Sequence, residues 1–169
     1  MGHKNTAKHK ASHGFQLKLL IISLVFGISF FSNSQTYKTI DGSMFSAKIP
    51  TTFVFDEIDS NPDYCNYESS SAGIKLIEFN SLNKYRFELD NIEDLYAEAV
   101  KNSKLKISYT IQKYNWFIIS GTNSNGNIVY WKRVIGDNFV SDLYIEYSSA
   151  NKSSIEKHIG EISRSFISL

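Results

Sequence analysis

Hydrophobic and polar positions alternate most clearly in the C-terminal half of the chain. Polar residues separate Leu105, Ile107, Tyr109 and Ile111, which predicts a half-buried strand with these four side chains on its inner face. Residues 116–119 follow as an unbroken apolar run, Trp-Phe-Ile-Ile, just before Gly121. A strand of this kind needs cover on both of its faces.

Two further strands are predicted beyond this run. Residues 124–127 read Ser-Asn-Gly-Asn, and an Asn-Gly pair accepts the positive φ that a tight hairpin turn requires. Residues 128–135 predict one strand and residues 139–147 another, with a turn at 136–138. One face of the last strand carries Phe139, Ser141, Leu143, Ile145 and Tyr147. These segments together predict a four-strand meander.

Two segments have the spacing of amphipathic helices. In the first, Asp90 and Glu93 have the spacing of a capping box, with Asp90 as the N-cap. The apolar face of this helix would consist of Ile92, Leu95, Ala99 and Val100. The apolar stripe of the second, C-terminal helix would consist of Ile155, Ile159, Ile162 and Phe166.

The pattern is weaker before the first helix. Residues 35–42 predict a polar lead-in, whereas residues 44–49, 53–55 and 74–79 predict three strands, the first stopped by Pro50. Residues 56–71 are rich in Asp, Asn and Ser and predict a loop. Strands, a helix, a meander and a second helix indicate an α+β domain, an antiparallel β-sheet covered by helices.

The first 34 residues predict a signal peptide. Four lysines and no acidic residue precede or border an apolar run of 13 residues at 19–31, which is shorter than the about 20 residues of a membrane-spanning helix. Small residues at 32–34 place cleavage before Gln35. Residues 35–169 would then be a single α+β domain in the periplasm or outside the cell. An uncleaved signal anchor that tethers the domain to the membrane is the alternative.

Composition narrows the classes of partner. The formal net charge is +1 for the chain and −3 after removal of the leader, so no nucleic-acid partner is expected. Aromatic residues make up 14% of the chain and Pro occurs only twice, which favours β-structure. Cys65 is the only cysteine, so the chain forms no internal disulfide.

Several short strings resemble a group of bacterial exported domains, many of which have no assigned function. The strings are Ile-Ser-Tyr-Thr at 107–110, Asn-Trp-Phe-Ile-Ile-Ser-Gly at 115–121 and Ile-Ser-Arg-Ser-Phe at 162–166, together with Tyr96 and Tyr130. The resemblance covers about the last 75 residues and implies a PsbP/Mog1-like α/β/α sandwich. Ser148 departs from the group, which usually has Pro there. The partners of PsbP-like and Mog1-like proteins do not transfer, because the shared residues are mostly core-forming.

The mature chain offers few groups for catalysis. Cys65 and His158 are its only Cys and His. They would either form a nucleophile–base pair or have separate structural roles, with His158 solvated on the helix flank and Cys65 partly buried. The usual ligands of a zinc site are lacking, no Gly-rich phosphate loop is present and no carboxylate pair stands out. No cofactor is expected.

One acidic stretch resembles the beginning of a calcium loop. Asp59, Asn61 and Asp63 have the D-x-N-x-D spacing, but Tyr64 and Ser70 stand where an EF-hand needs Gly and Glu. The alternatives are weak calcium binding in an irregular loop and an acidic, solvated loop.

Aromatic residues are the remaining candidates for binding. Tyr130 and Trp131 must point to opposite faces of the sheet, because neighbouring residues of a strand alternate. If helices cover only part of one face, Trp131 or Tyr144 would line a groove for a sugar, a peptide or another protein. If both faces are covered, these aromatic side chains belong to the core.

The sequence therefore predicts an exported, non-enzymatic accessory or interaction domain that binds an unknown protein or small ligand. The alternatives are a small extracytoplasmic hydrolase, which would use carboxylates or Cys65 and His158, and a weak calcium-responsive binding module. The only membrane contact expected is through the leader, if it is not cleaved.

Overall fold

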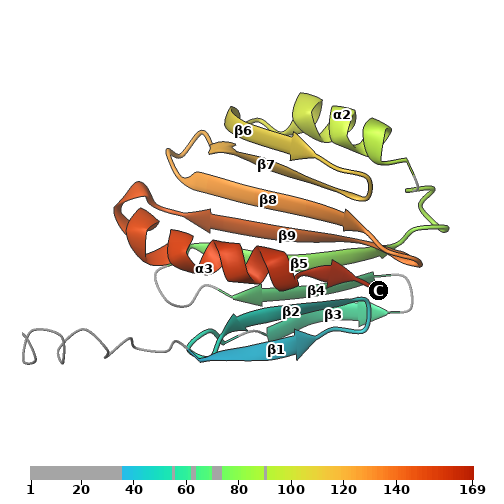
Figure 1. The fold of residues 1–169 in the computed structure, drawn as a ribbon, viewed down its shortest axis with the longest axis horizontal. Coiled ribbons are helices and arrows are strands. Elements are labelled where there is room, and N and C mark those ends of the chain that lie inside the picture. The colour runs from blue at the N-terminus through green and yellow to red at the C-terminus, as the bar shows by residue number, and fades with distance from the viewer. Residues whose placement is uncertain (1–35, 55, 62–63, 70–73, 90) are drawn as a thin grey trace, which may run out of the picture. The chain divides into compact units, whose positions relative to one another are not determined.

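Seven strands pair into one antiparallel β-sheet. The computed structural model describes residues 36–54, 56–61, 64–69, 74–89 and 91–169, with the backbone alone for 56–60 and 64–69, so the leader lies outside the described residues. In sheet order the strands are β3 (Asp56–Asn61), β4 (Tyr64–Ser69), β5 (Leu76–Asn83), β9 (Phe139–Tyr147), β8 (Ile128–Ile135), β7 (Trp116–Thr122) and β6 (Lys106–Gln112). The predicted meander, β6 to β9, is confirmed (Figure 1).

A second, three-stranded sheet consists of β1 (Tyr37–Asp41), β2 (Phe45–Pro50) and β10 (Ile167–Ser168). The predicted strand at 44–49 is confirmed as β2, but two neighbouring predictions are wrong. Residues 35–42 contain β1, because pairing of backbone groups with β2 outweighs the polar side chains. Phe53 lies in a turn, where its amide donates to the carbonyl of Pro50 at 3.0 Å, and residue 55 lies outside the described residues.

The two helices cover opposite faces of the large sheet (Figure 1). The first helix, α2 (Ile92–Asn102), packs on β7, and this side is called the α2 face. The C-terminal helix, α3 (Lys152–Ser165), follows the short 3₁₀ turn η1 (Ser149–Asn151) and packs with β2 on the other side, called the α3 face. Neither of these helices, the two that the structure describes, is long and apolar enough to span a bilayer.

The α3 face carries the larger core. Phe45 of β2 stacks on Phe79 of β5 with ring centroids 4.8 Å apart, and Phe166 contacts both rings. The predicted stripe of α3 is confirmed, since Ile155, Ile159 and Ile162 are buried in this core. Burial of each such side chain contributes about 1.5–3 kcal/mol, so these contacts join the small sheet, α3 and the large sheet.

A smaller core lies on the α2 face. It consists of Ile92, Leu95 and Ala99 from α2 with Phe117 and Ile119 from β7. On the opposite face, Trp116 packs against the larger core, but Trp116 and Ile118 are only partly buried. The expectation that residues 116–119 are covered on both faces is therefore confirmed for the α2 face alone. The predicted start of α2 is wrong by one residue. Asn91, not Asp90, is the N-cap, and its side-chain oxygen accepts the amide of Asp94 at 3.1 Å.

The predicted alternation in β6 fails at a β-bulge between Ile107 and Tyr109. The extra residue shifts the following side chains to the other face of the strand. Tyr109 is therefore 52% exposed instead of lying on the inner face.

β6 and β7 approach closely at Gly121, next to this bulge. A Cβ atom on Gly121 would lie 2.5 Å from the carbonyl oxygen of Lys106 and 3.0 Å from the Cα atom of Ile107. These are backbone atoms, which cannot move without disturbing the strand pairing. By contrast, Gly126 in the β7–β8 turn has a φ of +77° and no atom near its Cβ position.

Gly121→Ala is expected to destabilise the domain by about 1–3 kcal/mol, because the methyl group pushes β6 away from β7. Gly126→Ala is expected to cost only about 1 kcal/mol, the strain of a left-handed conformation. Urea unfolding of both variants measures the two losses of stability. Equal unfolding midpoints would contradict the larger loss expected for Gly121→Ala.

His158 is buried, so the prediction of a solvated imidazole is wrong. Only 5% of its surface is exposed, because it lies on the inner side of α3 beside Ile159. Its Nδ1 atom lies 3.3 Å from the hydroxyl oxygen of Tyr37, and its ring packs edge-on against Phe53. Burial, and after it the charge of Lys157, lowers the pKa of His158 below its usual 6.5.

This lowered pKa makes the stability depend on pH. Below about pH 6.5 the unfolded chain protonates its imidazole before the folded domain does, so stability falls as the pH drops from 6.5 toward the folded-state pKa. Thermal unfolding at pH 7.5 and pH 5 is expected to show a larger loss for the natural chain than for His158→Gln. Equal losses in the two proteins would rule out His158 as the source.

Candidate binding groove

Part of the α2 face is left uncovered by α2 and forms a groove of about 410 Å³. The described residues that line it come from three adjacent strands and are Leu76, Glu78 and Asn80 of β5, Trp131 of β8, and Asp142, Tyr144 and Glu146 of β9. They share one face because they occupy alternate positions and lie in register: Glu78 pairs with Tyr144, and Tyr144 with Trp131.

Trp131 stands at the boundary between the groove and the smaller core. Its ring packs edge-on against Phe117 with centroids 5.7 Å apart, and the guanidinium carbon of Arg133 lies 5.2 Å from its centroid. The indole N–H donates to Asp142 at 2.9 Å. These three contacts fix the indole, so the groove has a rigid aromatic wall.

Asp142 and Arg133 form the strongest polar contact of the groove. The guanidinium of Arg133 donates to both carboxylate oxygens of Asp142, at 2.8 and 2.7 Å. Burial alone would lower the pKa of Arg133, but the hydrogen bonds and charge of Asp142 outweigh it and raise that pKa. The Arg133 guanidinium therefore stays charged, and the two hydrogen bonds fix both side chains in place.

Glu146 lies at the other end of the groove, and Tyr144 lies between it and Asp142 on β9. The Asn127 amide donates to Glu146 at 2.7 Å, and Lys75 Nζ lies 3.9 Å from the same carboxylate oxygen. Burial raises the pKa of Tyr144, and the charge of Glu146, a hydrogen bond to it and the charge of Glu78 raise this pKa further. Tyr144 is thus a neutral hydroxyl among carboxylates.

Asn80 of β5 lies opposite Asp142 of β9, at the first end of the groove. Its side-chain oxygen is buried and has no hydrogen-bond partner in the structure. A buried acceptor without a partner costs about 1–3 kcal/mol, and natural proteins leave few such groups unsatisfied.

A second hollow of about 330 Å³ adjoins the groove and shares Trp131 and Tyr144 with it. Its other described lining residues come from the C-terminal end of α2 and the β7–β8 turn, and they are Asn102, Ser103, Lys104, Leu105, Asn123 and Ser124. The two hollows together make a longer depression with the aromatic pair at its middle.

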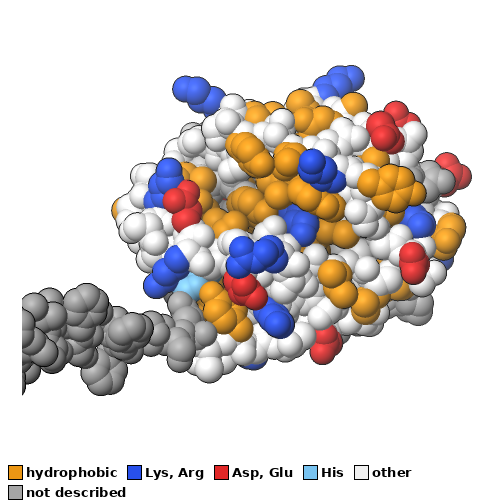
Figure 2. All heavy atoms as spheres, in the orientation of Figure 1, with side chains coloured by type: hydrophobic (Ala, Val, Ile, Leu, Met, Phe, Trp, Pro, Cys, Tyr) orange, Lys and Arg blue, Asp and Glu red, His pale blue; other side chains and the backbone are white. Residues whose placement is uncertain are grey.

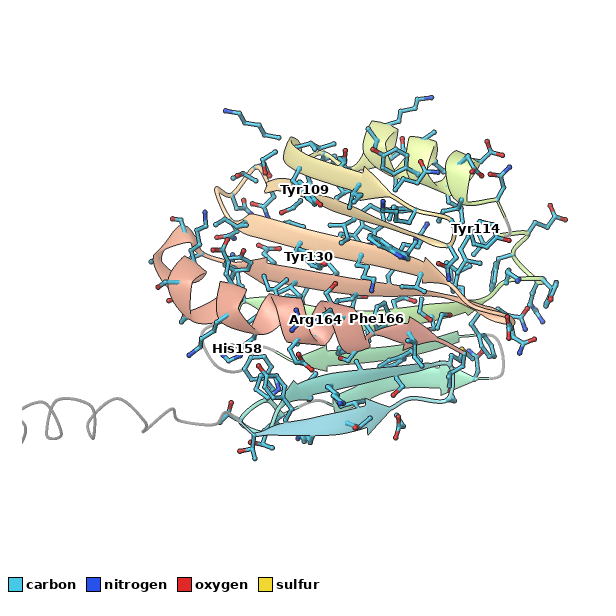
Figure 3. All side chains as sticks on the ribbon, viewed as in Figure 1. Tyr109, Tyr114, Tyr130, His158, Arg164 and Phe166 are labelled. Atoms are coloured by element: carbon cyan, nitrogen blue, oxygen red, sulfur yellow. The ribbon has the colours of Figure 1, made fainter. Side chains whose placement is uncertain are left out.

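Of the three aromatic residues singled out in the sequence, Trp131 and Tyr144 line the groove and Tyr130 does not. Tyr130 lies on the α3 face, where Figure 3 shows it between Tyr109 and the labelled residues of α3. Its hydroxyl donates to Ser163 of α3 at 2.6 Å. Figure 2 shows hydrophobic side chains gathered on this face, beside α3. Tyr130 therefore anchors a helix, and its binding role remains a prediction without support.

The residues singled out for calcium lie in a different setting from the one predicted. Residues 56–71 do not form a loop, since β3 and β4 pair as a hairpin that contains Asp59 and Asn61, while Asp63 lies outside the described residues. Along an extended strand, residues two apart are separated by about 6.6 Å, so this backbone does not wrap around an ion as an EF-hand loop does. The loop prediction is wrong, and calcium binding stays an untested prediction.

The other chemical hypotheses also gain no support. His158 lies on the α3 face, and the side chain of Cys65 lies outside the described residues. Among the described side chains, no three His, Cys, Asp or Glu come together in a group that would hold a metal ion.

The sequence interpretation missed the polar half of the groove. Asp142, Tyr144 and Glu146 alternate with the buried face of the last strand, so the polar stripe was visible in the same pattern that predicted the strand. Glu78 and Asn80 come from a strand more than 60 residues earlier, and only the β5–β9 pairing brings them to the groove.

No known protein family and no curated protein matches the sequence. Solved structures are nevertheless similar in fold. The solution structure of cyanobacterial PsbP (CyanoP) from Synechocystis sp. PCC 6803 matches with a TM-score of 0.53 and 4% identity, over 82% of this chain and 96% of that one. The fold is PsbP-like. The predicted α+β class, with an antiparallel sheet between helices, is thereby confirmed, and the small sheet is an addition to it.

Two other solved structures are similar at lower scores. One is a protein from Bacteroides thetaiotaomicron VPI-5482, with a TM-score of 0.45 and 10% identity over 80% of this chain and 48% of that one. The other is a protein of unknown function from Pseudomonas aeruginosa, with a TM-score of 0.41 and 10% identity over 72% of this chain and 89% of that one. At such identities the likeness concerns the fold alone, and the motif-based resemblance to exported domains remains a prediction.

Asp142→Asn is expected to destabilise the domain by about 1–3 kcal/mol, because it removes the charge that pairs with Arg133 and turns an amide donor toward guanidinium donors. Asp137→Asn makes the same charge change in the exposed β8–β9 turn and is expected to change stability by less than about 0.5 kcal/mol. Urea unfolding of both variants checks the difference, and an Asp142→Asn midpoint equal to that of the natural chain would contradict it.

Proposed function

We propose that the protein is an exported accessory domain that acts by binding a ligand in the groove of its α2 face. The observation that carries this proposal is the uncovered part of the sheet, where Trp131 and Tyr144 line a depression next to acidic and amide side chains. Pockets of roughly 300–1,000 Å³ with aromatic walls and a few fixed polar groups are typical ligand sites.

A binding role suits the polar groups better than a catalytic one. Asp142 is held by Arg133 and the Trp131 indole, and Glu146 accepts the Asn127 amide, so both carboxylates already have fixed structural partners. The raised pKa of Tyr144 keeps its hydroxyl protonated, which makes it a hydrogen-bonding group and a poor base. The proposed mechanism is recognition by a rigid aromatic wall and a polar rim.

Export follows from the leader. The apolar run at 19–31 and the small residues at 32–34 support cleavage before Gln35. The intact mass of the protein, purified from cells that express the full-length chain, would then equal that of residues 35–169.

NMR of this protein tests the binding proposal. Sugars, amino-acid amides, guanidines, carboxylates and phosphates are added separately, and at least one class is expected to shift the Trp131 indole N–H signal and the amides of β5 and β9. Tyr144→Ala is expected to abolish these shifts, and Tyr109→Ala, which removes an exposed tyrosine from the other face, to leave them unchanged. Absence of shifts with every class, or conversion of an added compound to product, would overturn the proposal.

A further inference from the structure

The groove carries acidic charge. Three of its lining residues are Glu78, Asp142 and Glu146, and none of the lining residues that the structure describes is basic. Arg133 neutralises Asp142 from beside the groove. Lys75 approaches Glu146 only to 3.9 Å and is itself 60% exposed, and long contacts with a solvated lysine are weak. The groove is therefore negative at Tyr144, where the charges of Glu146 and Glu78 both act.

The state of Tyr144 reflects this field. Burial is the first cause of its raised pKa, and the charges of Glu146 and Glu78 raise that pKa further. A negative potential acts on a phenol in this way, since it disfavours the phenolate. The same potential favours a cation placed near the ring, and the face of a neutral tyrosine adds a cation–π attraction.

The fold already holds one cation in such surroundings. The guanidinium of Arg133 lies 5.2 Å from the Trp131 ring centroid and is bound by both oxygens of Asp142. The adjoining half of the groove offers the same combination of a ring and carboxylates. Tyr144 supplies the ring, Glu78 lies opposite it in the register of β5 and β9, and Glu146 lies two residues further along its own strand.

A second, independent observation comes from Asn80. Its side-chain oxygen is buried at the groove without a hydrogen-bond partner, although it is an acceptor. Asn80 lies two residues from Glu78 on the same face of β5, so an N–H donor that is bound at Glu78 and reaches this oxygen would supply the partner that it lacks. Guanidinium carries five N–H donors and no acceptor, so it fits a lining that consists of carboxylates and this carbonyl.

The length of the depression favours a peptide over an isolated small cation. The second hollow continues from Trp131 and Tyr144 toward Asn102 and Ser103 at the C-terminal end of α2. This hollow has space for a neighbouring residue of the ligand. Lys104 lines it as well, so the cationic side chain belongs in the first hollow and not in the second.

We propose that the groove binds an arginine-bearing peptide segment, with the guanidinium between Glu78 and Glu146 at the Tyr144 ring and the adjoining residue in the second hollow. This inference rests on the proposed function, because it names the ligand class for the same groove. The shared chemistry is a planar cation recognised by an aromatic ring and two carboxylates.

The test uses the purified full-length gene product and three blocked tripeptides, acetyl-Gly-X-Gly-amide with X as arginine, lysine or citrulline. Citrulline has nearly the shape of arginine without the charge. The arginine peptide is expected to shift the Trp131 indole signal with at least about tenfold higher affinity than the citrulline peptide, with lysine between them. Its affinity is also expected to fall as salt rises from 0.05 to 0.5 M.

Variants of the protein provide the matched controls. Glu78→Gln combined with Glu146→Gln keeps the side-chain shapes and is expected to weaken the arginine peptide about tenfold or more. Glu161→Gln removes an acidic charge from α3, on the opposite face, and is expected to leave the affinity unchanged. Thermal unfolding confirms that each variant is folded.

The outcomes separate the inference from the proposed function. Equal binding of the arginine and citrulline peptides, or an unchanged affinity in the Glu78/Glu146 variant, would overturn the inference. Groove signals that respond to a disaccharide and not to the arginine peptide would also overturn it, while the proposed function would stand. If no compound of any class shifts the groove signals, both fail.

Discussion

The width of a helix compared with the width of the sheet determines how this domain is organised. An α-helix with its side chains is about 10 Å across, and strands lie about 4.8 Å apart, so one helix covers about two strands. The large sheet has seven strands. On the α3 face, the small sheet and α3 both pack on the large sheet and contribute to one core. On the α2 face, α2 packs on β7 without such help, and β5, β8 and β9 are left to form a groove with polar side chains.

Strand alternation then lets one segment serve both faces. In β8, Tyr130 and Lys132 point to the α3 face, where the Tyr130 hydroxyl donates to the Ser163 side chain and Lys132 Nζ to the Ser163 carbonyl at 2.5 Å. A cation is favourable at that point because the last carbonyls of a helix carry partial negative charge. Trp131 and Arg133, which alternate with them, build the groove wall. The helix anchor and the groove are thus fixed by the same eight-residue strand.

The sequence predicts the strands and helices whose apolar residues recur at a regular spacing. It fails where backbone pairing between strands forms structure without such a spacing. The meander and α3 follow directly from their apolar spacing. Strands β1, β3 and β4 were missed because their sequences lack a regular alternation of apolar and polar residues, whereas the structure pairs their backbones with neighbouring strands. Two residues were misplaced for local reasons. His158 lies on the buried side of α3, and the β-bulge in β6 turns Tyr109 outward. Half of the groove was predictable, since alternation identifies Trp131 on β8 and the stripe of Asp142, Tyr144 and Glu146 on β9. Glu78 and Asn80 reach the groove only through the long-range pairing of β5 with β9, which no local pattern encodes.

The early start of β1 has a consequence for how freely the domain can move. Tyr37 already pairs with Pro50, and only five residues separate it from the end of the apolar run at residue 31. A cleaved leader would release a body whose first strand begins almost at its new amino terminus, with little loose chain for proteases to attack.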